Sequence, residues 1–413
     1  MSGASSPSPQ SATVRVAPAM ADIDRAAWDA CANPPAPLLN GAPPDREEAA
    51  YNPFISWDFL QALEESGCVS ARAGWLPQHL VLEEDGDVVA AAPCYLKSHS
   101  RGEYVFDSGW AEAFEMAGGS YYPKLQVAVP FTPVPGRRLL TPPGPEAAGR
   151  RRVLAAALAE LCRRHDASSV HLTFISEAES RLLGELGLLQ RTDRQFHWED
   201  KGYGDFDGFL AALASRKRKA IRKERREAVT AGIEIEWLTG SAIGEADWDA
   251  FFGFYMDTGS RKWGRPYLNR RFFSLLGSRM ADRVALVMAR RGGRPIAGAL
   301  NLIGSDTLYG RYWGCSEDHP FLHFEVCYYQ AIAFALAHGL ARVEAGAQGA
   351  HKLARGYEPV ITRSAHFIAD PRLRRAVADY LDQERRHVEL EARVLAEHAP
   401  FRRGGTLDRG GAG

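Results

Sequence analysis

The sequence predicts an α/β fold with a mixed sheet, organised as two similar units in tandem. The chain has 413 residues, more than one ordinary hydrophobic core accommodates. The same order of strand and helix patterns occurs twice, and a strongly basic segment separates the two occurrences. We expect disordered ends at 1–12 and 401–413, a first unit at 13–199, a basic helical linker at 200–231, a second unit at 232–370 and a C-terminal helix at 371–400.

The first half reads as strand, two helices, three strands, helix, strand, helix and strand. Ser56 stands where it caps a helix through Glu65, and Asp85-Gly86 indicates a hairpin between two alternating segments. The sequence of the aromatic segment 104–119 does not predict a helix or a strand. The expected strands are 13–17, 79–83, 88–95, 124–140, 170–175 and 188–198, and the expected helices are 22–31, 56–65, 146–165 and 178–186.

The second half repeats this order. Asn269 is placed to cap a helix at 270–280, and Gly292-Gly293 indicates a hairpin. Pro320 stands at the expected first position of a helix that Gly339 ends. The expected strands are 232–237, 284–289, 295–302, 308–314, 342–345 and 361–368, and the further helices are 248–257 and 371–398.

The recurrence reaches single residues, which predicts an internal duplication. Trp28-Asp29-Ala30 matches Trp248-Asp249-Ala250 in the same place of the order. The other matches are Pro53-Phe54 with Pro266-Tyr267, Arg194 with Arg363, and His197 with His366. Their shared order argues against chance more strongly than any one match does.

Composition excludes several classes of protein. The net charge is −1, so a preference for a polyanionic partner must be local. The six cysteines are scattered, without a CxxC motif or a histidine pair at zinc spacing, which predicts a reducing compartment and no metal site. No run of about 18 apolar residues predicts a membrane span, and the N-terminus lacks the pattern of a signal peptide. We therefore expect a cytoplasmic protein with no covalently bound cofactor.

The order of elements resembles the GNAT acyltransferase unit, and two such units in tandem resemble the Fem-like transferases, which add amino acids to cell-wall precursors. The segment SRKRKAIRKERREAVTAGIEIE is similar to the basic helix that leads into the second Fem unit, although Glu224 stands where alanine is usual. The whole chain looks still more like a family of predicted Fem-like N-acyltransferases labelled as peptidoglycan biosynthesis or recognition proteins. The stretches that carry this likeness are NPFISWDFLQALE, YYPKLQVAVPFTPVPGRRLL, HFEVCYYQAI and GAQGAHKLARGYEP.

The resemblance implies where a donor would lie. In a GNAT unit the fourth strand diverges from the fifth, and the pantetheine arm of the donor fills the gap, with the diphosphate at the next helix N-terminus. These places map to 309–314 and 316–322 in the second unit, and to 131–140 and 142–148 in the first. Neither loop carries the usual phosphate signature. Acyl-CoA and aminoacyl-tRNA, the donor of Fem enzymes, both remain open as co-substrate.

The densest polar cluster of the chain follows Gly346. Its candidate catalytic residues are His351, Lys352 and Tyr357, to which the helix residue Glu325 is added either as a base or as the partner of a buried cation. The substrate-binding candidates are Arg355, Gln348, Arg311 and Trp313 in the second unit, and Tyr122, Lys124 and Arg137 in the first. Structural alternatives are a solvated surface for His351 and Lys352, an ion pair of Arg355 with Glu344 or Glu358, core packing for Tyr357, and a solvent-exposed strand end for Arg137.

The run 215–226 contains eight basic residues and one acid. Its polyanion-binding candidates are Arg218, Arg222 and Lys223, which would follow an RNA phosphate backbone or approach an anionic membrane surface. A solvated face without a partner is the third interpretation. The apolar content is too thin for membrane insertion.

We therefore expect an N-acyltransferase that moves an acyl or aminoacyl group from acyl-CoA or aminoacyl-tRNA to a primary amine, for which the resemblance implies a cell-wall precursor. The second unit is the expected active one. The alternatives are a catalytically idle binding or scaffold protein and an RNA-binding protein that uses the basic helix. The sequence gives no indication of the oligomeric state.

Overall fold

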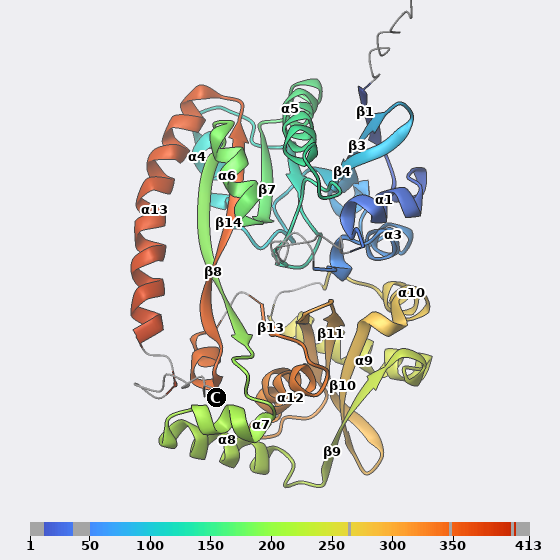
Figure 1. The fold of residues 1–413 in the computed structure, drawn as a ribbon, viewed down its shortest axis with the longest axis vertical. Helices are drawn as coiled ribbons and strands as arrows, with labels where there is room; N and C mark the ends of the chain where they lie inside the picture. Colours follow the sequence, from blue (N-terminus) through green and yellow to red (C-terminus); the bar gives the residue numbers. More distant parts are fainter. Residues whose placement is uncertain (1–11, 36–49, 263–265, 347–348, 398–399, 402–413) are drawn as a thin grey trace, which may run out of the picture. The chain divides into compact units, whose positions relative to one another are not determined.

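A computed structural model describes residues 12–35, 50–262, 266–346, 349–397 and 400–401 (Figure 1). The ends expected to be disordered lie outside the described residues, except that Ala12 begins the first strand and Phe401 forms a bridge with Leu213. The candidate Gln348 also lies outside them. The chain forms two compact units, and each comprises segments from both halves of the sequence. Unit 1 is Met1–Asp193, Tyr267–Met280 and Thr362–His387, and unit 2 is Arg194–Pro266, Ala281–Ile361 and Val388–Gly413.

Unit 1 contains two sheets. The smaller has the order β1-β3-β4, and the larger has the order β2-β5-β6-β7-β14. The strands are β1 (Ala12–Ala17), β2 (Trp75–Pro77), β3 (His79–Glu84), β4 (Asp87–Ala92), β5 (Cys94–Lys97), β6 (Lys124–Val127), β7 (Ser169–Ile175) and the end of β14 (Glu358–Ile368). The helices are α1 (Arg25–Ala32), α3 (Trp57–Glu65), α4 (Ser108–Met116), α5 (Ala147–Arg164), α6 (Glu177–Glu185), α10 (Arg270–Met280) and the first part of α13 (Pro371–Glu397).

Unit 2 contains a mixed sheet with the order β8-β13-β12-β11-β10-β9. Its strands are β9 (Ile233–Thr239), β10 (Val284–Arg291), β11 (Arg294–Ile303), β12 (Thr307–Cys315), β13 (Arg342–Glu344) and the end of β8 (Leu189–Glu199). Its helices are α7 (Phe206–Ala212), α8 (Ser215–Ala228), α9 (Glu245–Lys262), α11 (Leu322–Phe324) and α12 (Gln330–Ala337), with a π-helical turn at Glu325–Tyr329 and a 3-10 helix, η7, at Ala350–Arg355.

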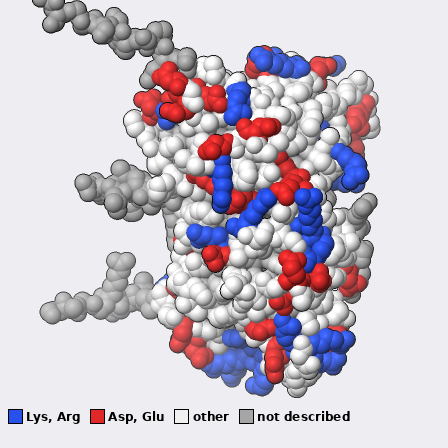
Figure 2. Space-filling model, turned by 90° about the vertical axis from the view of Figure 1, so that its right-hand side faces the viewer, with Lys and Arg blue, Asp and Glu red and all other residues white. Residues whose placement is uncertain are grey.

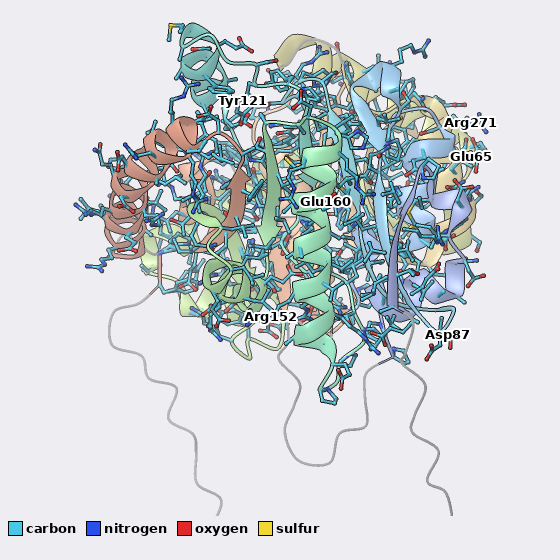
Figure 3. The ribbon with its side chains drawn as sticks, turned by 90° about the horizontal axis from the view of Figure 1, so that it is seen from above. Glu65, Asp87, Tyr121, Arg152, Glu160 and Arg271 are labelled. Carbon is cyan, nitrogen blue, oxygen red and sulfur yellow. The ribbon has the colours of Figure 1, made fainter. Side chains whose placement is uncertain are left out.

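The two halves of the sequence exchange their closing strands. β14 comes from the second half, and its residues Arg363–Ile368 pair antiparallel with β7 in unit 1. β8 comes from the first half, and its residues His197–Glu199 pair antiparallel with β13 in unit 2. Helix α10 also belongs to unit 1, where the ion pair of Glu65 with Arg271 joins it to α3 (Figure 3). Each unit is therefore complete only with segments that are distant in the sequence.

Local signals explain most element boundaries. The side chain of Ser56 accepts a hydrogen bond from the Phe59 amide, and that of Asn269 accepts one from the Phe272 amide, so both predicted caps are confirmed. The predicted helix start at Pro320 is wrong, because the helix begins at Leu322 after Phe321 adopts a left-handed conformation with φ of 63°.

The predicted strand 124–140 is wrong beyond Val127, where β6 ends. Prolines at 130, 133 and 135 lack the amide hydrogens that a ladder needs, so the chain continues as irregular structure.

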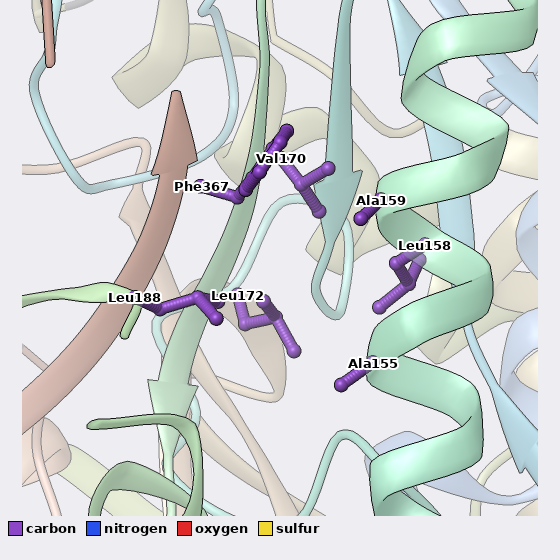
Figure 4. A pocket seen from close by; sticks show the side chains of 7 residues that line it. All are labelled: Ala155, Leu158, Ala159, Val170, Leu172, Leu188 and Phe367. Atoms are coloured by element: carbon purple, nitrogen blue, oxygen red, sulfur yellow. The ribbon is translucent and has the colours of Figure 1, made fainter. Parts of the chain in front are cut away.

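One face of the large sheet of unit 1 packs against helix α5. Leu125, Val127, Val170 and Leu172 pack against α5, whose exposed side carries Arg152 and Glu160 (Figure 3). A cavity of about 20 Å³ in this core has a wholly apolar lining (Figure 4). It is the size of a single water molecule, so it is too small to hold a substrate. Among the described helices, none combines the length and apolarity that crossing a bilayer requires.

Candidate functional site

In unit 2, strand β12 diverges from its parallel neighbour β13. The two strands pair only along Thr307–Tyr309 and Arg342–Glu344, whereas β12 continues to Cys315 against β11. The register between β11 and β12 shifts after Leu300, so that Arg311 is the extra residue of a bulge. This is the divergence of strands that the resemblance implies for the donor site.

Lys352 lies directly beyond the end of β13. Its side chain is 3% exposed, and its Nζ donates to the carbonyl oxygens of Ala345 at 2.5 Å and Gly346 at 2.9 Å. Burial, together with the smaller effect of the nearby positive charge of Arg311, lowers the pKa of Lys352 to about 7. The amine is therefore held by neutral acceptors and changes its charge near neutral pH.

Arg311 bridges the diverging strands. Its guanidinium donates to Glu344 at 2.9 Å and to the Gly310 carbonyl at 3.0 Å. Burial raises the pKa of Glu344, although Arg311 opposes the shift. His197 of β8 is the register partner of Glu344, and burial holds the pKa of its imidazole well below the ordinary value. The hydrogen bonds of Arg311 are thus made within the protein, to Glu344 and the Gly310 carbonyl. Its predicted role in substrate binding stays a prediction.

His351 is exposed and lies among aromatic rings. Its Nε2 is 3.0 Å from the Tyr328 hydroxyl, and burial raises the pKa of that phenol, so the phenol keeps its proton and can donate a hydrogen bond to the imidazole. The rings of Phe324 and His323 lie 5.8 Å and 6.4 Å from His351. Trp313, at the end of β12, lies 5.1 Å from His323. The structure therefore brings His351, Lys352 and Trp313 to one end of the sheet.

Two further candidates are engaged in hydrogen bonds. Tyr357 is fully buried, and its hydroxyl donates to the Tyr328 carbonyl at 3.3 Å. Glu325 is 2% exposed, and it accepts hydrogen bonds from Arg225 at 3.1 Å and Gln330 at 2.7 Å. Of the two alternatives for Glu325, the structure contains the ion pair. The π-helical turn that places it is a feature often found at functional sites.

Arg355 forms an ion pair that differs from the expected ones. It donates to Glu224 at 3.0 Å, whereas Glu344 pairs with Arg311 and Glu358 pairs with Lys201. It also donates to the His351 carbonyl at 2.8 Å, and its guanidinium lies 3.4 Å from the centre of the Phe324 ring.

The candidates of unit 1 have a different environment. Lys124 is fully buried, and its Nζ donates to Ser100 at 2.8 Å, to Glu103 at 2.7 Å and to Asp107. Burial opposes its charge, yet the two carboxylates raise the pKa of Lys124 above the ordinary value. Tyr122 lies 2.8 Å from Ser100 through its hydroxyl.

Arg137 is buried, so the alternative of a solvent-exposed strand end is wrong. Its guanidinium donates to the carbonyl oxygens of Cys31, Ala32 and Thr141. The roles of Tyr122, Lys124 and Arg137 toward a substrate stay predictions.

The place in unit 1 that corresponds to the donor gap is filled by the chain itself. The Gly136 amide donates to the Phe174 carbonyl at the end of β7. The Glu179 carboxylate accepts from the amides of Arg138 at 2.8 Å and Leu139 at 2.6 Å. An internal acid thus occupies backbone amides in the segment that corresponds to the place of the pantetheine arm.

Helix α8 presents the predicted polyanion-binding residues. Arg222 pairs with Asp207 at 3.3 Å, and Lys223 pairs with Glu227 at 3.6 Å. Within the described part of the chain, Arg218 has no ion-pair partner, and the same holds for Arg216, Lys217, Lys219 and Arg226. Figure 2 shows basic and acidic side chains interspersed over one face of the molecule. Positive charge is nevertheless concentrated in the sequence of α8, where eight of the residues 215–226 are basic.

Sequence reasoning missed Tyr328 and the pairing role of Glu224. Tyr328 lies in an aromatic segment that is also typical of an ordinary hydrophobic core, so nothing in the sequence distinguished it as a functional residue. Glu224 had a signal, because it is the one acid in the basic run and the departure from the resembled pattern. Among the described residues, no group of three or more His, Cys, Asp and Glu side chains is arranged to hold a metal ion.

A comparison with solved structures shows that the fold is similar to that of FemX. FemX matches with a TM-score of 0.52 at 11% identity, covering 86% of this chain and 98% of FemX. A tandem GNAT protein from the clavulanic acid biosynthesis pathway matches at 0.46 and 15% identity, covering 87% and 99%. A conserved protein from Bacteroides thetaiotaomicron matches at 0.48 and 11% identity, covering 87% and 100%.

The chain belongs to the FemAB-like family, described as peptidoglycan biosynthesis/recognition, whose model matches residues 19–403. The predicted fold class and family resemblance are both confirmed. No curated protein matches the sequence significantly.

Proposed function

We propose that the protein is an N-acyltransferase that moves an acyl or aminoacyl group from an activated donor to a primary amine of a cell-wall precursor. The observation that carries the proposal is Lys352, a buried amine with a pKa of about 7 beside the diverging strands. A base whose pKa lies near the operating pH is best suited to transfer protons in both directions. Family membership supports the cell-wall context.

The proposed reaction uses this amine as a proton carrier. The donor carbonyl carbon lies between β12 and β13, and the neutral substrate amine attacks it to form a new C–N bond. Lys352 accepts a proton from the attacking nitrogen. As the C–S or C–O bond to the donor breaks, the proton passes to the leaving thiolate or ribose oxygen. His351, hydrogen-bonded to Tyr328 at 3.0 Å, lies one residue away and is the second proton acceptor.

Both candidate donors carry an adenosine. The partly exposed rings of Trp313, His323 and Phe324, with the buried Arg355 guanidinium over Phe324, form an aromatic surface at the same end of the sheet. Such surfaces stack nucleobases without requiring a particular sequence. This supports a nucleotide-bearing donor, and the choice between coenzyme A and tRNA is left to the assay.

The test is the double variant H351A/K352A, assayed for transfer from an acyl-CoA thioester and, separately, from an aminoacyl-tRNA to a precursor amine. We expect transfer to fall by at least about 100-fold, with circular dichroism and unfolding midpoint unchanged. The matched control is K201A, which removes a lysine of unit 2 that pairs with Glu358 on the surface. Full transfer by the double variant refutes the site. If neither donor produces heat in calorimetry with the parent protein, the scaffold alternative gains.

A contribution of α8 to RNA binding is a second proposal. It is supported by the five cations of α8 that have no ion-pair partner among the described residues. Each phosphate they neutralise makes the affinity more dependent on salt. RNA affinity should therefore fall steeply as salt rises, and R218A should reduce that slope. Absent or salt-independent binding removes this proposal.

A further inference from the structure

Helix α8 has two faces with different partners. Arg216, Lys219, Lys223 and Arg226 are exposed and recur at helical spacing, so they form one outward stripe. The opposite face contains the buried Ile221 and Ala228. With 1.5 Å of rise per residue, the stripe extends about 15 Å, long enough to contact several phosphates in succession. We call this stripe the outer face of α8.

Glu224 connects the helix to the candidate catalytic segment η7. Its carboxylate accepts from Arg355 at 3.0 Å and from the Tyr329 hydroxyl. Arg355 in turn donates to the His351 carbonyl at 2.8 Å. Two consecutive hydrogen bonds therefore lead from α8 to the backbone of His351, next to Lys352.

A second ion pair fixes the same helix. Arg225 donates to Glu325 at 3.1 Å in the π-helical turn, and its guanidinium lies 4.1 Å from the centre of the Phe206 ring. Neighbouring residues of α8 thus contact the two segments that carry the site, η7 through Glu224 and the π-helical turn through Arg225. A displacement of α8 would change both contacts together.

The segment η7 depends on such contacts for its conformation. It lies between Gly349, with φ of 111°, and Gly356, with φ of 90°, and both values are accessible mainly to glycine. At its ends the Lys352 amide donates to the Gly349 carbonyl at 3.0 Å, the Gly356 amide to the Leu353 carbonyl at 3.1 Å and the Tyr357 amide to the Lys352 carbonyl at 3.3 Å. A short helix with a flexible residue at each end has little stability of its own.

We propose that Glu224 is a positioning residue that couples RNA bound on the outer face of α8 to the conformation of η7. RNA that restrains the helix stabilises the Glu224–Arg355 ion pair, and through it the placement of His351 and Lys352. The proposal rests on the proposed function only for the catalytic meaning of η7. RNA is the occupant we choose because the outer face is a cationic stripe that matches a phosphate backbone and offers no large apolar side chain to insert into a bilayer.

Hydrogen–deuterium exchange of the full-length protein tests the positioning role. In E224Q the amides of Gly349–Tyr357 should exchange about 10-fold faster, because a partly buried charged hydrogen bond is lost. The matched control E227Q removes the same charge from the same helix, where Glu227 pairs with the exposed Lys223, and should exchange as the parent does. The conservative variant E224D should recover most of the protection. Equal exchange in E224Q and E227Q, or no recovery in E224D, overturns the role.

The coupling is tested by adding unacylated bulk tRNA. The parent should gain protection in Gly349–Tyr357 on binding, whereas E224Q should bind with similar affinity and gain none. Absence of tRNA binding, or binding without protection in the parent, overturns the coupling. Protection by anionic phosphatidylglycerol vesicles instead of tRNA assigns the surface to lipid and overturns the RNA assignment. No donor or acceptor takes part, so this result is independent of the transfer assay.

Discussion

Two buried lysines, Lys124 in unit 1 and Lys352 in unit 2, show how partners decide what burial does to a charge. Lys124 donates to two carboxylates, Glu103 and Asp107, and stays charged. Lys352 donates to two backbone carbonyls, and its pKa falls to about 7. Burial opposes the charge in both cases. The ion pairs of unit 1 make its lysine a structural element, whereas the neutral partners in unit 2 leave a lysine that can exchange protons.

The two units also differ in the region that corresponds to the donor gap. In unit 1 the place corresponding to the donor gap is filled, because Glu179 binds the amides of Arg138 and Leu139. In unit 2 strand β12 runs on past its pairing with β13. A shared order of elements therefore permits different environments at the ends of the strands.

The largest expected effect is on stability. K124M leaves Asp107 buried without its lysine and leaves Glu103 with the more distant Lys97 at 3.7 Å, so we expect the free energy of unfolding to fall by about 3–5 kcal/mol. K352M loses the two hydrogen bonds of the amine but also removes the cost of burying that amine. Its free energy of unfolding should therefore change by less than about 2 kcal/mol. Urea unfolding of both variants is the measurement. Equal losses would show that the two lysines are held in the same way.

The second effect concerns the pH dependence of transfer. If Lys352 acts as the base, kcat/KM should rise with pH and reach half its maximum near pH 7, since the amine must be neutral. R311M removes the positive charge that favours the neutral amine, so the midpoint should move up by about one pH unit. The variant R222Q, on helix α8, should leave the midpoint in place. A profile that R311M does not move argues against Lys352 as the base.

The smallest effect concerns stability in acid. Burial lowers the pKa of His171 to about 3, and it holds the pKa of His366 and His197 well below their ordinary value. The unfolded chain binds these protons near pH 6.5, so stability is present above that pH and is lost toward pH 3. Each histidine should cost about 2 kcal/mol at pH 5.

The variant H197N should lose less stability than the parent between pH 7 and pH 5, as measured by urea unfolding. The difference between variant and parent isolates the histidine from buried carboxyls such as Glu179 and Glu344. The raised pKa values of these carboxyl groups make the folded state more stable, not less, as the pH falls. An identical acid dependence of variant and parent would contradict the neutral, buried state of His197.

Most of the fold could be predicted because its signals are local. Ser56 and Asn269 mark helix starts through their own side chains, and paired glycines mark hairpins. Helix α4 escaped prediction because its segment mixes aromatic residues and glycine without a clear period. The exchange of β8 and β14 between the units could not be predicted, since strand pairing depends on contacts between residues far apart in the sequence.

The candidate site was predictable only in part. The polar density after Gly346 led to His351 and Lys352, and both lie at the end of the diverging strands. The partners that set their chemistry come from elsewhere: Glu224 from the basic helix, Tyr328 from an aromatic run and Glu344 from a strand. Residue type indicates what a side chain can do, but the pKa of Lys352 depends on neighbours that only the folded chain assembles.

The exchanged strands have a consequence for biosynthesis. Unit 1 includes Thr362–His387, so a ribosome must synthesise the chain as far as these residues before unit 1 has its full set of strands. Until then β7 presents an unpaired edge, a template for association with other nascent chains. A gene fragment that encodes only the first half would lack its closing strand, so production of this protein should depend on uninterrupted synthesis and on protection by chaperones.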